Sequence, residues 1–284
     1  MRGLIGIIGG SGIYEMDGLQ NIEEIDIDTP FGKPSDSIVL GTLSGRRLAF
    51  LPRHGRGHRI MPGELNFRAN IWAMKKLGVE WLLSFSAVGS LKEEIKPRDV
   101  VIPDQIFDRT LQRPRTFFGN GIVAHISFAS PFCPVLRKLL MESSRKLGLA
   151  VHDGGTYVCI EGPAFSTKAE SAVNRMLGFS IVGMTAVPEA RLAREAEIAY
   201  ATVALSTDYD VWHDSGEVSV EMVMENLRTN TENVKRIIKE IVPQIPTDLF
   251  SPSHDALKGA IMTDRSIWPD ETVKRLGVII ERYL

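Results

Sequence analysis

Short apolar runs of strand length recur along the chain, and polar or glycine-containing turns separate them. A run of this length bounded by turn residues is typical of a buried β-strand. The predicted strands cover residues 4–8, 37–40, 47–51, 80–85, 100–103, 157–160, 180–184 and 200–206.

Helical spacing of apolar residues appears between and after these runs. Residues 62–77 predict a helix, with a proline at the start and Gly78 as the stop. Ser219 is a candidate N-cap for a longer helix that Pro243 ends. The apolar stripe of that helix is Val220, Val223, Leu227, Val234, Ile237 and Ile241, and a last stripe is Val273, Leu276, Ile280 and Tyr283. Interleaved strands and helices predict a three-layer α/β/α fold around a central mixed sheet.

The domain organisation follows from length and from the absence of boundaries in the pattern. With 284 residues and 44% hydrophobic content, the chain can bury one large core. It has no internal repeat, low-complexity tract or long linker. We expect one α/β domain over residues 1–246, and a C-terminal extension with helical segments over residues 247–284 that packs on the same domain.

Charge and cysteine content narrow the class of partner. The chain has 33 basic and 35 acidic residues and no long run of one sign, which argues against nucleic-acid or membrane-surface binding. No segment approaches the ~20 apolar residues that a membrane helix needs. The two cysteines, Cys133 and Cys159, are best explained as structural thiols of a reducing compartment, although one disulfide is possible. We therefore expect a small-molecule ligand and a cytoplasmic location.

Candidate chemistry follows four of the predicted strands, where ligands of α/β folds collect. The segments are GGSG at 9–12, PRHGRGH at 52–58, SAVGS at 86–90, and Thr185. Together these predicted turns supply hydroxyl groups, an arginine fork, a histidine donor and free backbone N–H groups, which suit a phosphate. Taken singly, GGSG can be a plain tight turn and RHGRGH a solvated basic loop.

Two carboxylates, Asp208 and Asp210, follow the very apolar run 199–205. Strand alternation would place both on one side, with Tyr209 on the other. They can cap a helix, bind a divalent ion, or accept hydrogen bonds from an amino-bearing heterocycle. No spaced set of further ligands supports a metal, so the heterocycle is favoured. Phe165 can be a core residue or a plate on which a flat ring stacks.

The combination of motifs resembles the trimeric purine nucleoside phosphorylase family, and within it the methylthioadenosine phosphorylases. The likeness covers about residues 5–245 and rests on GIIGGSGI, DTPFGKPSD, PRHGRGHRIMP, NFRANIWAMKKLG, AVGSLKEEIKPRDVVIPDQ, EGPAFSTKAES, MTAVPEA and STDYD. It implies phosphorolysis of S-methyl-5′-thioadenosine to adenine and 5-methylthioribose 1-phosphate in purine and methionine salvage, with adenosine as a further substrate. It also implies no cofactor, since inorganic phosphate is a co-substrate, and a homotrimer or homohexamer.

The resemblance also implies residue roles. Phosphate would be held by Ser11, Arg53, His54, Ser86, Ala87 and Thr185. Met184 would lie against the ribose, Phe165 near the purine, and Asp208 and Asp210 at its N7 and 6-amino edge. Ser166, Val220 and Val223 would set specificity, and His125 would reach a neighbouring subunit's ribose pocket. Ala164 stands where the family usually has arginine.

The expected chemistry needs one acid. As phosphate attacks C1′, positive charge develops on the ribosyl ring and the purine leaves. A carboxyl group with a raised pKa can protonate N7, and Asp208 is the candidate. The alternatives are a purine nucleoside phosphorylase of broader specificity, a histidine phosphatase with His54 as phosphoryl acceptor, and a nucleoside-binding module without turnover.

Overall fold

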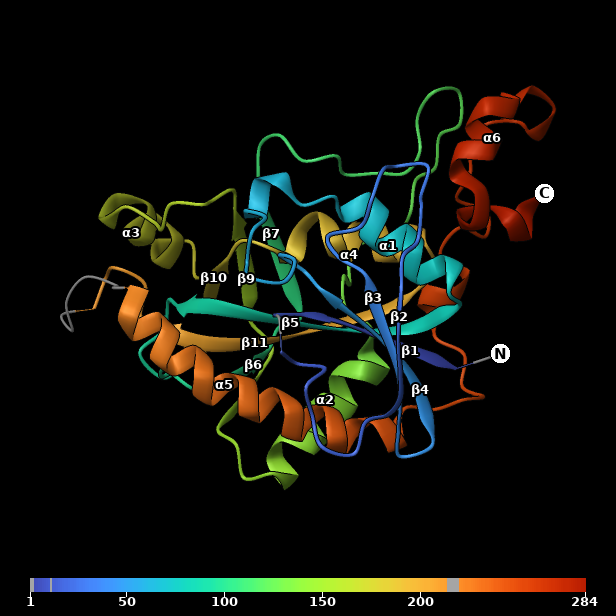
Figure 1. Cartoon of the computed structure of the whole chain (residues 1–284). Coiled ribbons are helices and arrows are strands. Elements are labelled where there is room, and N and C mark those ends of the chain that lie inside the picture. Colours follow the sequence, from blue (N-terminus) through green and yellow to red (C-terminus); the bar gives the residue numbers. More distant parts are fainter. Residues whose placement is uncertain (1–2, 11, 214–219) are drawn as a thin grey trace.

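A computed structural model describes residues 3–10, 12–213 and 220–284, with the side chains of 220–224 left out of the description (Figure 1). The strands are β1 (Leu4–Gly9), β2 (Gln20–Ile25), β3 (Ile38–Leu43), β4 (Arg46–Pro52), β5 (Val79–Ser90), β6 (Val100–Ile102), β7 (Gln105–Arg109), β8 (Val151–Asp153), β9 (Thr156–Ile160), β10 (Ile181–Gly183) and β11 (Ala199–Asp208). The α-helices are α1 (Phe67–Lys76), α2 (Pro134–Lys146), α3 (Lys168–Met176), α4 (Ala186–Glu195), α5 (Val220–Ile241) and α6 (Asp270–Leu276).

The strands form one 11-stranded mixed sheet. Its main path runs β2-β3-β4-β1-β5-β10-β9-β7, and β11 pairs with both β5 and β6. The parallel pairs include β1 with β4, β1 with β5, and β11 with β5, whereas β10 runs antiparallel to β5. The predicted three-layer α/β fold is therefore confirmed, with a mixed sheet at its centre.

Alternate residues of the central strands point to opposite layers, as strand geometry requires. In β1, Ile5 and Ile7 join the core that includes α2 and α5, whereas Leu4 and Ile8 join the core that includes α1 and α4. Figure 1 shows α2 and α5 on one side of the sheet and α1 and α4 on the other. Because both faces are covered, these strands read as continuous apolar runs rather than alternating ones.

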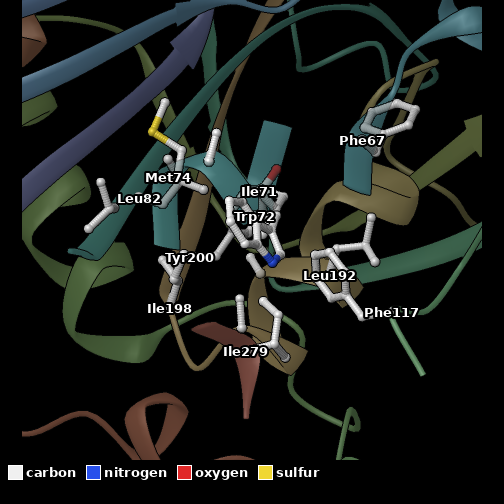
Figure 2. Packing of buried hydrophobic residues seen from close by; sticks show 14 of the residues in the cluster. Phe67, Ile71, Trp72, Met74, Leu82, Phe117, Leu192, Ile198, Tyr200 and Ile279 are labelled. Carbon is white, nitrogen blue, oxygen red and sulfur yellow. The ribbon is translucent and has the colours of Figure 1, made fainter. Parts of the chain in front are cut away.

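The α1 side of the core gathers large side chains from distant parts of the chain (Figure 2). Trp72 of α1 donates from its indole Nε1 to the carbonyl of Leu276 at 3.0 Å. Leu276 and Ile279, from the C-terminal tail, are fully or almost fully buried in the same cluster. The Tyr283 hydroxyl and the Leu257 amide both bond to Glu197. Residues 252–284 thus pack against the core that α1 and α4 share.

Several predicted bounds differ from the observed elements. Residues 62–77 form a short 3₁₀ turn, Pro62–Glu64, and then α1, because the Asn66 side chain accepts from the Ala69 amide at 3.2 Å and caps the helix there. The SAVGS segment, predicted as a turn, continues β5 to Ser90. The pattern missed β2 because all but one of its residues are exposed and none is fully buried. Across the described residues, no helix is long and apolar enough to cross a membrane.

Candidate functional site

The site begins where the sheet branches at the end of β5. On one edge of β5, β1 pairs as far as Ser84, and β10 pairs at Gly89 and Ser90. β11 occupies the other edge from Trp81 to Gly89. In the described part of the chain, no strand therefore covers residues 85–88 on the first edge. Backbone groups left without a ladder partner are available to a ligand, and Ala87 is exposed although both of its neighbours are buried.

Three hydroxyl groups meet beside this opening. The Ser86 Oγ lies 3.0 Å from Thr185 Oγ1 and 3.2 Å from the hydroxyl of Tyr157. The sequence predicts Ser86 and Thr185 as site residues but not Tyr157, because an aromatic residue in an apolar strand such as β9 is typical of the core. Gly183 makes room for it, since a Cβ there would come within 2.0 Å of the tyrosine oxygen. Burial raises the pKa of Tyr157 to about 12, so it remains a neutral hydroxyl.

Arg53 is almost fully buried at the end of β4, and its guanidinium is largely committed to the protein. Nε and Nη2 form a bidentate ion pair with Glu189 at 2.8 and 2.9 Å. The second Nη2 hydrogen goes to Ser84 Oγ and one Nη1 hydrogen to the Phe85 carbonyl. The fork that the sequence suggested for phosphate therefore binds Glu189. One Nη1 hydrogen remains without a partner in the described residues, so Arg53 can offer an anion a single donor and a positive charge.

His54 has a defined tautomer. Its Nδ1 lies 2.8 Å from the carbonyl oxygen of Ile60, which can only accept, so Nδ1 carries the hydrogen. Burial is the main cause that lowers the pKa of His54 to about 4, and the charge of Arg53 lowers it further. The ring is therefore neutral near pH 7, with Nε2 as an acceptor. It stacks on His58 with ring centroids 4.2 Å apart. The sequence predicts His54 as a hydrogen-bond donor to the anion, whereas the structure leaves its Nε2 as an acceptor.

Asp208 ends β11 and Asp210 follows in a turn, and both are buried. Asp210 has a φ of 52°, so strand alternation is not what brings the two carboxylates together. Both face Gly89, where a Cβ would meet Asp208 Oδ1 at 3.0 Å and the Asp210 Cβ at 3.4 Å. The Asp210 amide also donates to Asp208 Oδ1 at 2.8 Å. Burial raises the pKa of Asp208, and the charge of Asp210 adds to that rise.

The surroundings of Asp210 contain unpaired polar atoms. Its Oδ2 and the hydroxyls of Ser166 and Ser171 are buried, and none has a hydrogen-bond partner of good geometry in the described residues. Burial raises the pKa of Asp210, although the nearby hydroxyls of Ser171 and Ser166 offset part of the rise. Buried polar atoms are normally paired, so this group indicates the place of a polar ligand edge. The family resemblance points to Ser166 but not to Ser171.

Met184 follows β10 and directly precedes Thr185, and Phe165 lies in the loop between β9 and α3. The Met184 sulfur is close to Gly162, where a Cβ would come within 2.4 Å of it. Its carbonyl accepts from Nη1 of Arg113 at 2.6 Å, and Nη2 of the same arginine donates to the carbonyl of Glu161 at 2.7 Å. Arg113 was missed because it sits in a long loop. Phe165 is 49% exposed, which excludes a fully buried core role in this chain.

Some predicted residues are not joined to this group. Ser11 lies outside the described residues, as do the side chains of Val220 and Val223 and the proposed N-cap Ser219. His125 is exposed, and its amide donates to the Ala260 carbonyl at 2.9 Å, beside the C-terminal tail. Ala164 is exposed in the loop that carries Phe165.

The remaining candidate chemistry concerns thiols and metals. Cys133 and Cys159 are free and buried, which agrees with structural thiols. Burial raises the pKa of Cys159 to about 11, so it is not a nucleophile near neutral pH. Within the described ranges, no group of three or more histidine, cysteine, aspartate or glutamate side chains is arranged to hold a metal ion.

Comparison with known proteins places this geometry in a family. Residues 4–243 match the model of the Phosphorylase superfamily. S-methyl-5′-thioadenosine phosphorylase of Gloeobacter violaceus is 55% identical, over 98% of this chain and 95% of that protein. The enzyme of the same name from Geobacter sulfurreducens is 54% identical over the full length of both chains.

Solved structures give the same result. A methylthioadenosine phosphorylase from an antarctic soil metagenomic library superposes with a TM-score of 0.94 at 49% identity, over 98% of this chain and 99% of that one. An adenosine/methylthioadenosine phosphorylase mutant from Schistosoma mansoni, in complex with adenine, superposes with a TM-score of 0.82 at 39% identity, over 86% and 92% of the two chains. The chain belongs to the Phosphorylase superfamily and, within it, to the S-methyl-5′-thioadenosine phosphorylases.

Proposed function

We propose that this chain cleaves S-methyl-5′-thioadenosine with inorganic phosphate, releasing adenine and 5-methylthioribose 1-phosphate. The names of its relatives support the reaction. The observation that carries it is the arrangement along β5. Ser86 and Ala87 stand at the open edge, and Gly89 faces the two buried carboxylates. Three residues of extended strand span about 10 Å, the scale of a nucleoside with a phosphate at C1′.

The anion binds at the open edge of β5. The Ser86 and Thr185 hydroxyls and the Ala87 backbone supply donors, and Arg53 supplies its charge and one hydrogen. By the family resemblance we add the hydroxyl of Ser11, which lies outside the described residues. His54 presents an acceptor, so it pairs with a protonated phosphate oxygen or takes up that proton. Arg53 cannot move toward the anion without breaking its buried pair with Glu189, which keeps the charge in a fixed place.

The purine binds against Phe165 with its N7 and 6-amino edge toward Asp208 and Asp210. The unpaired Asp210 Oδ2 accepts from the 6-amino group, and the Ser166 hydroxyl completes the polar edge. Asp208, whose pKa is raised by burial, holds a proton at higher pH than an exposed aspartate. It gives that proton to N7 as the bond from C1′ to N9 breaks. The bonding electrons leave with the base, and a phosphate oxygen forms the new bond to C1′.

The ribose and its 5′ substituent lie between these two ends, with Met184 against the sugar. By the family resemblance we assign the methylthio group to Val220 and Val223, whose side chains lie outside the described residues. Burial of that group favours methylthioadenosine over adenosine by roughly 1–2 kcal/mol on a scale of ~0.8 kcal/mol per methylene. Adenosine therefore remains a slower substrate. Val220→Asp should lower kcat/KM for methylthioadenosine far more than for adenosine.

The assembly is a homotrimer, or two stacked trimers, in which His125 serves the adjacent subunit. The exposure of His125 supports this role, because an exposed side chain can reach an adjacent subunit. Mixing Asp208→Asn subunits with His125→Ala subunits would then restore activity to some sites. No recovery after verified subunit exchange would contradict sharing. We also place the enzyme in the cytoplasm, because its two thiols are free and buried.

The decisive experiment compares kcat/KM for methylthioadenosine, adenosine, inosine and methylthioinosine with phosphate present and with phosphate omitted. We expect methylthioadenosine to lead and free adenine to appear only with phosphate. Adenine release without phosphate would indicate a hydrolase. Ligand binding without turnover would indicate a nucleoside-binding module, and a phosphohistidine on His54 would indicate a phosphatase.

A further inference from the structure

Thr207, directly before Asp208, occupies an irregularity in the sheet. In the ladder of β11 with β5, Ser206 pairs with Val88 and Asp208 pairs with Gly89, so Thr207 is the extra residue of a β-bulge. Bulges re-aim side chains and occur often beside active sites. Thr207 is 2% exposed. Its hydroxyl lies 2.7 Å from Asp208 Oδ2 and 3.2 Å from the carbonyl oxygen of Val88.

The Thr207 hydroxyl therefore has two possible acceptors, the Val88 carbonyl oxygen and Asp208 Oδ2, for its one hydrogen. A threonine hydroxyl carries a single hydrogen, so it cannot donate to Val88 and to an ionised Asp208 at once. When Asp208 is ionised, the shorter contact is a hydrogen bond from Thr207 to the carboxylate. When Oδ2 carries a proton, Asp208 donates to Thr207 Oγ1, and the threonine hydrogen turns to the Val88 carbonyl. Both protonation states are then paired by rotation of one hydroxyl.

We propose that Thr207 is a positioning residue that stabilises Asp208 in both protonation states through this rotation. The inference rests on the proposed role of Asp208 as the acid. With the purine bound, the Asp208 O–H turns from Thr207 Oγ1 to N7. Its proton then passes to N7, and the bond between C1′ and N9 breaks with its electrons moving to the base. The hydrogen of Thr207 then turns from Val88 to Oδ2 and compensates the new negative charge. Without the hydroxyl, the Asp210 amide would be the only donor that the described residues offer to the ionised carboxylate.

The backbone at the bulge is held in place, which leaves hydroxyl rotation as the available motion. The Asn226 Nδ2 of α5 donates to the Thr207 carbonyl at 2.7 Å. The Asn226 Oδ1 in turn accepts from Nε of Arg98 at 2.8 Å. Asn230, one turn further along α5, donates to the Ser206 carbonyl at 3.1 Å. The helix thus fixes the last residues of β11 on both sides of the hydroxyl.

The charged surroundings of Asp208 do not duplicate this function. Asp210 is the titratable neighbour that acts on Asp208, and its negative charge opposes ionisation. Among the described residues, the charged groups of the surrounding elements have hydrogen-bond or ion-pair partners of their own. Glu189 of α4 pairs with Arg53, which directly follows β4, at 2.8 Å. Glu225 of α5 pairs with Arg98, in the loop before β6, at 3.6 Å. Glu170 of α3 accepts a hydrogen bond from Thr167. β5 presents uncharged residues along 86–90.

The test is the pH dependence of kcat for methylthioadenosine, at saturating phosphate, in the series Thr207→Ser, Thr207→Cys and Thr207→Val. The rate requires protonated Asp208, so it falls above the pKa of that group in the bound complex. Loss of a hydrogen bond to the ionised form raises that pKa. For Thr207→Val we expect the alkaline limb to move up by about one pH unit and the plateau kcat to fall about 10-fold, with little change in KM for phosphate.

Thr207→Ser keeps a hydroxyl and should retain the wild-type limb, and Thr207→Cys, with its weaker donor, should fall between. Thr202→Val is the matched control, because Thr202 is a buried threonine of the same strand whose hydroxyl does not contact Asp208, and its limb should not move. If Thr207→Val does not fold, the Ser and Cys variants still test the order.

An unmoved limb in Thr207→Val, or a Thr207→Ser variant that behaves like valine, would overturn the proposal. Failure of the underlying function has a different signature. Wild-type enzyme that releases no adenine would refute the reaction, and an Asp208→Asn variant that retains the wild-type limb would refute Asp208 as the acid.

Discussion

The two ends of the site differ in how their polar groups are satisfied. At the phosphate end, Arg53 has nearly all of its donors bound to Glu189, Ser84 and the Phe85 carbonyl before any ligand arrives. At the purine end, Asp210 and two serine hydroxyls are buried with unpaired atoms, as far as the described residues show. A phosphate is a symmetric anion that a fixed charge can attract without fine discrimination. A purine edge must be told apart from similar edges, and unpaired groups do this because a wrong partner leaves them unsatisfied.

We expect the largest effect from a substitution at the phosphate end. Arg53→Ala leaves Glu189 as a buried, unpaired carboxylate, because the two share a bidentate ion pair. We expect the free energy of unfolding to fall by about 3–5 kcal/mol, together with a strong rise in the KM for phosphate. Chemical denaturation and steady-state kinetics measure the two effects.

The matched change at the other end is Asp210→Asn, which removes a charge whose buried Oδ2 has no hydrogen-bond partner of good geometry among the described residues. Its unfolding free energy should stay within about 1 kcal/mol of wild type. If Asp210→Asn and Arg53→Ala destabilised the fold equally, the polar groups of the phosphate end and the purine end would not differ in how they are satisfied.

The next effect concerns the acid. Asp208→Asn cannot give a proton to N7, and general-acid help contributes on the order of 10²–10⁴-fold. We expect kcat for methylthioadenosine to fall at least about 100-fold, with the KM for phosphate little changed. His54→Ala is the comparison at the anion end, where the KM for phosphate should rise and kcat should fall less. If instead Asp208→Asn raised the KM for phosphate and His54→Ala lowered kcat more, Asp208 would belong to the anion site and His54 would be the acid.

Base discrimination sharpens the comparison further. A 6-oxo purine places an acceptor opposite the Asp210 carboxylate and leaves a buried group unpaired. The expected preference for 6-amino over 6-oxo purines is at least ~2 kcal/mol in kcat/KM. Asp210→Asn, which offers a donor, should narrow that gap. Inosine cleaved as efficiently as adenosine by the wild-type enzyme would show that this end does not read the base.

The smallest effect is a pH dependence of stability at His54. Its folded pKa is about 4, below the usual value of about 6.5, so the unfolded chain binds the proton first as pH falls. The stability that the neutral, buried His54 contributes is fully present above pH 6.5 and is lost as the pH falls toward 4. Between pH 7 and 5 we expect the free energy of unfolding of the wild type to fall by about 1–2 kcal/mol more than that of His54→Asn. Asparagine is the control because it keeps a donor for the Ile60 carbonyl. Urea titrations at the two pH values measure this difference, and parallel curves would argue against a neutral, buried His54.

The apolar pattern predicted the central strands well because their burial on both faces makes each a continuous hydrophobic run. It failed for β2, which is largely exposed, and for the end of β5, where small residues such as Ser86 and Gly89 look like a turn although they continue a strand. The carboxylates were found as a pair, but by an alternation that the positive φ of Asp210 does not follow. Local pattern cannot show where a ladder slips, because the slip depends on the partner strand.

The amino-acid sequence by itself determined the α/β class, the strand ends that carry chemistry, and the residue types gathered there, because these depend on burial period and on side chains that are adjacent in the chain. The tertiary structure decided what those side chains do. Glu189 is 136 residues from Arg53 and takes its fork, Tyr157 is 71 residues from Ser86 and joins its hydroxyl, and Val88 is 119 residues from Thr207. Such contacts arise from strand order and register, which bring distant residues within hydrogen-bond distance and which no local spacing encodes.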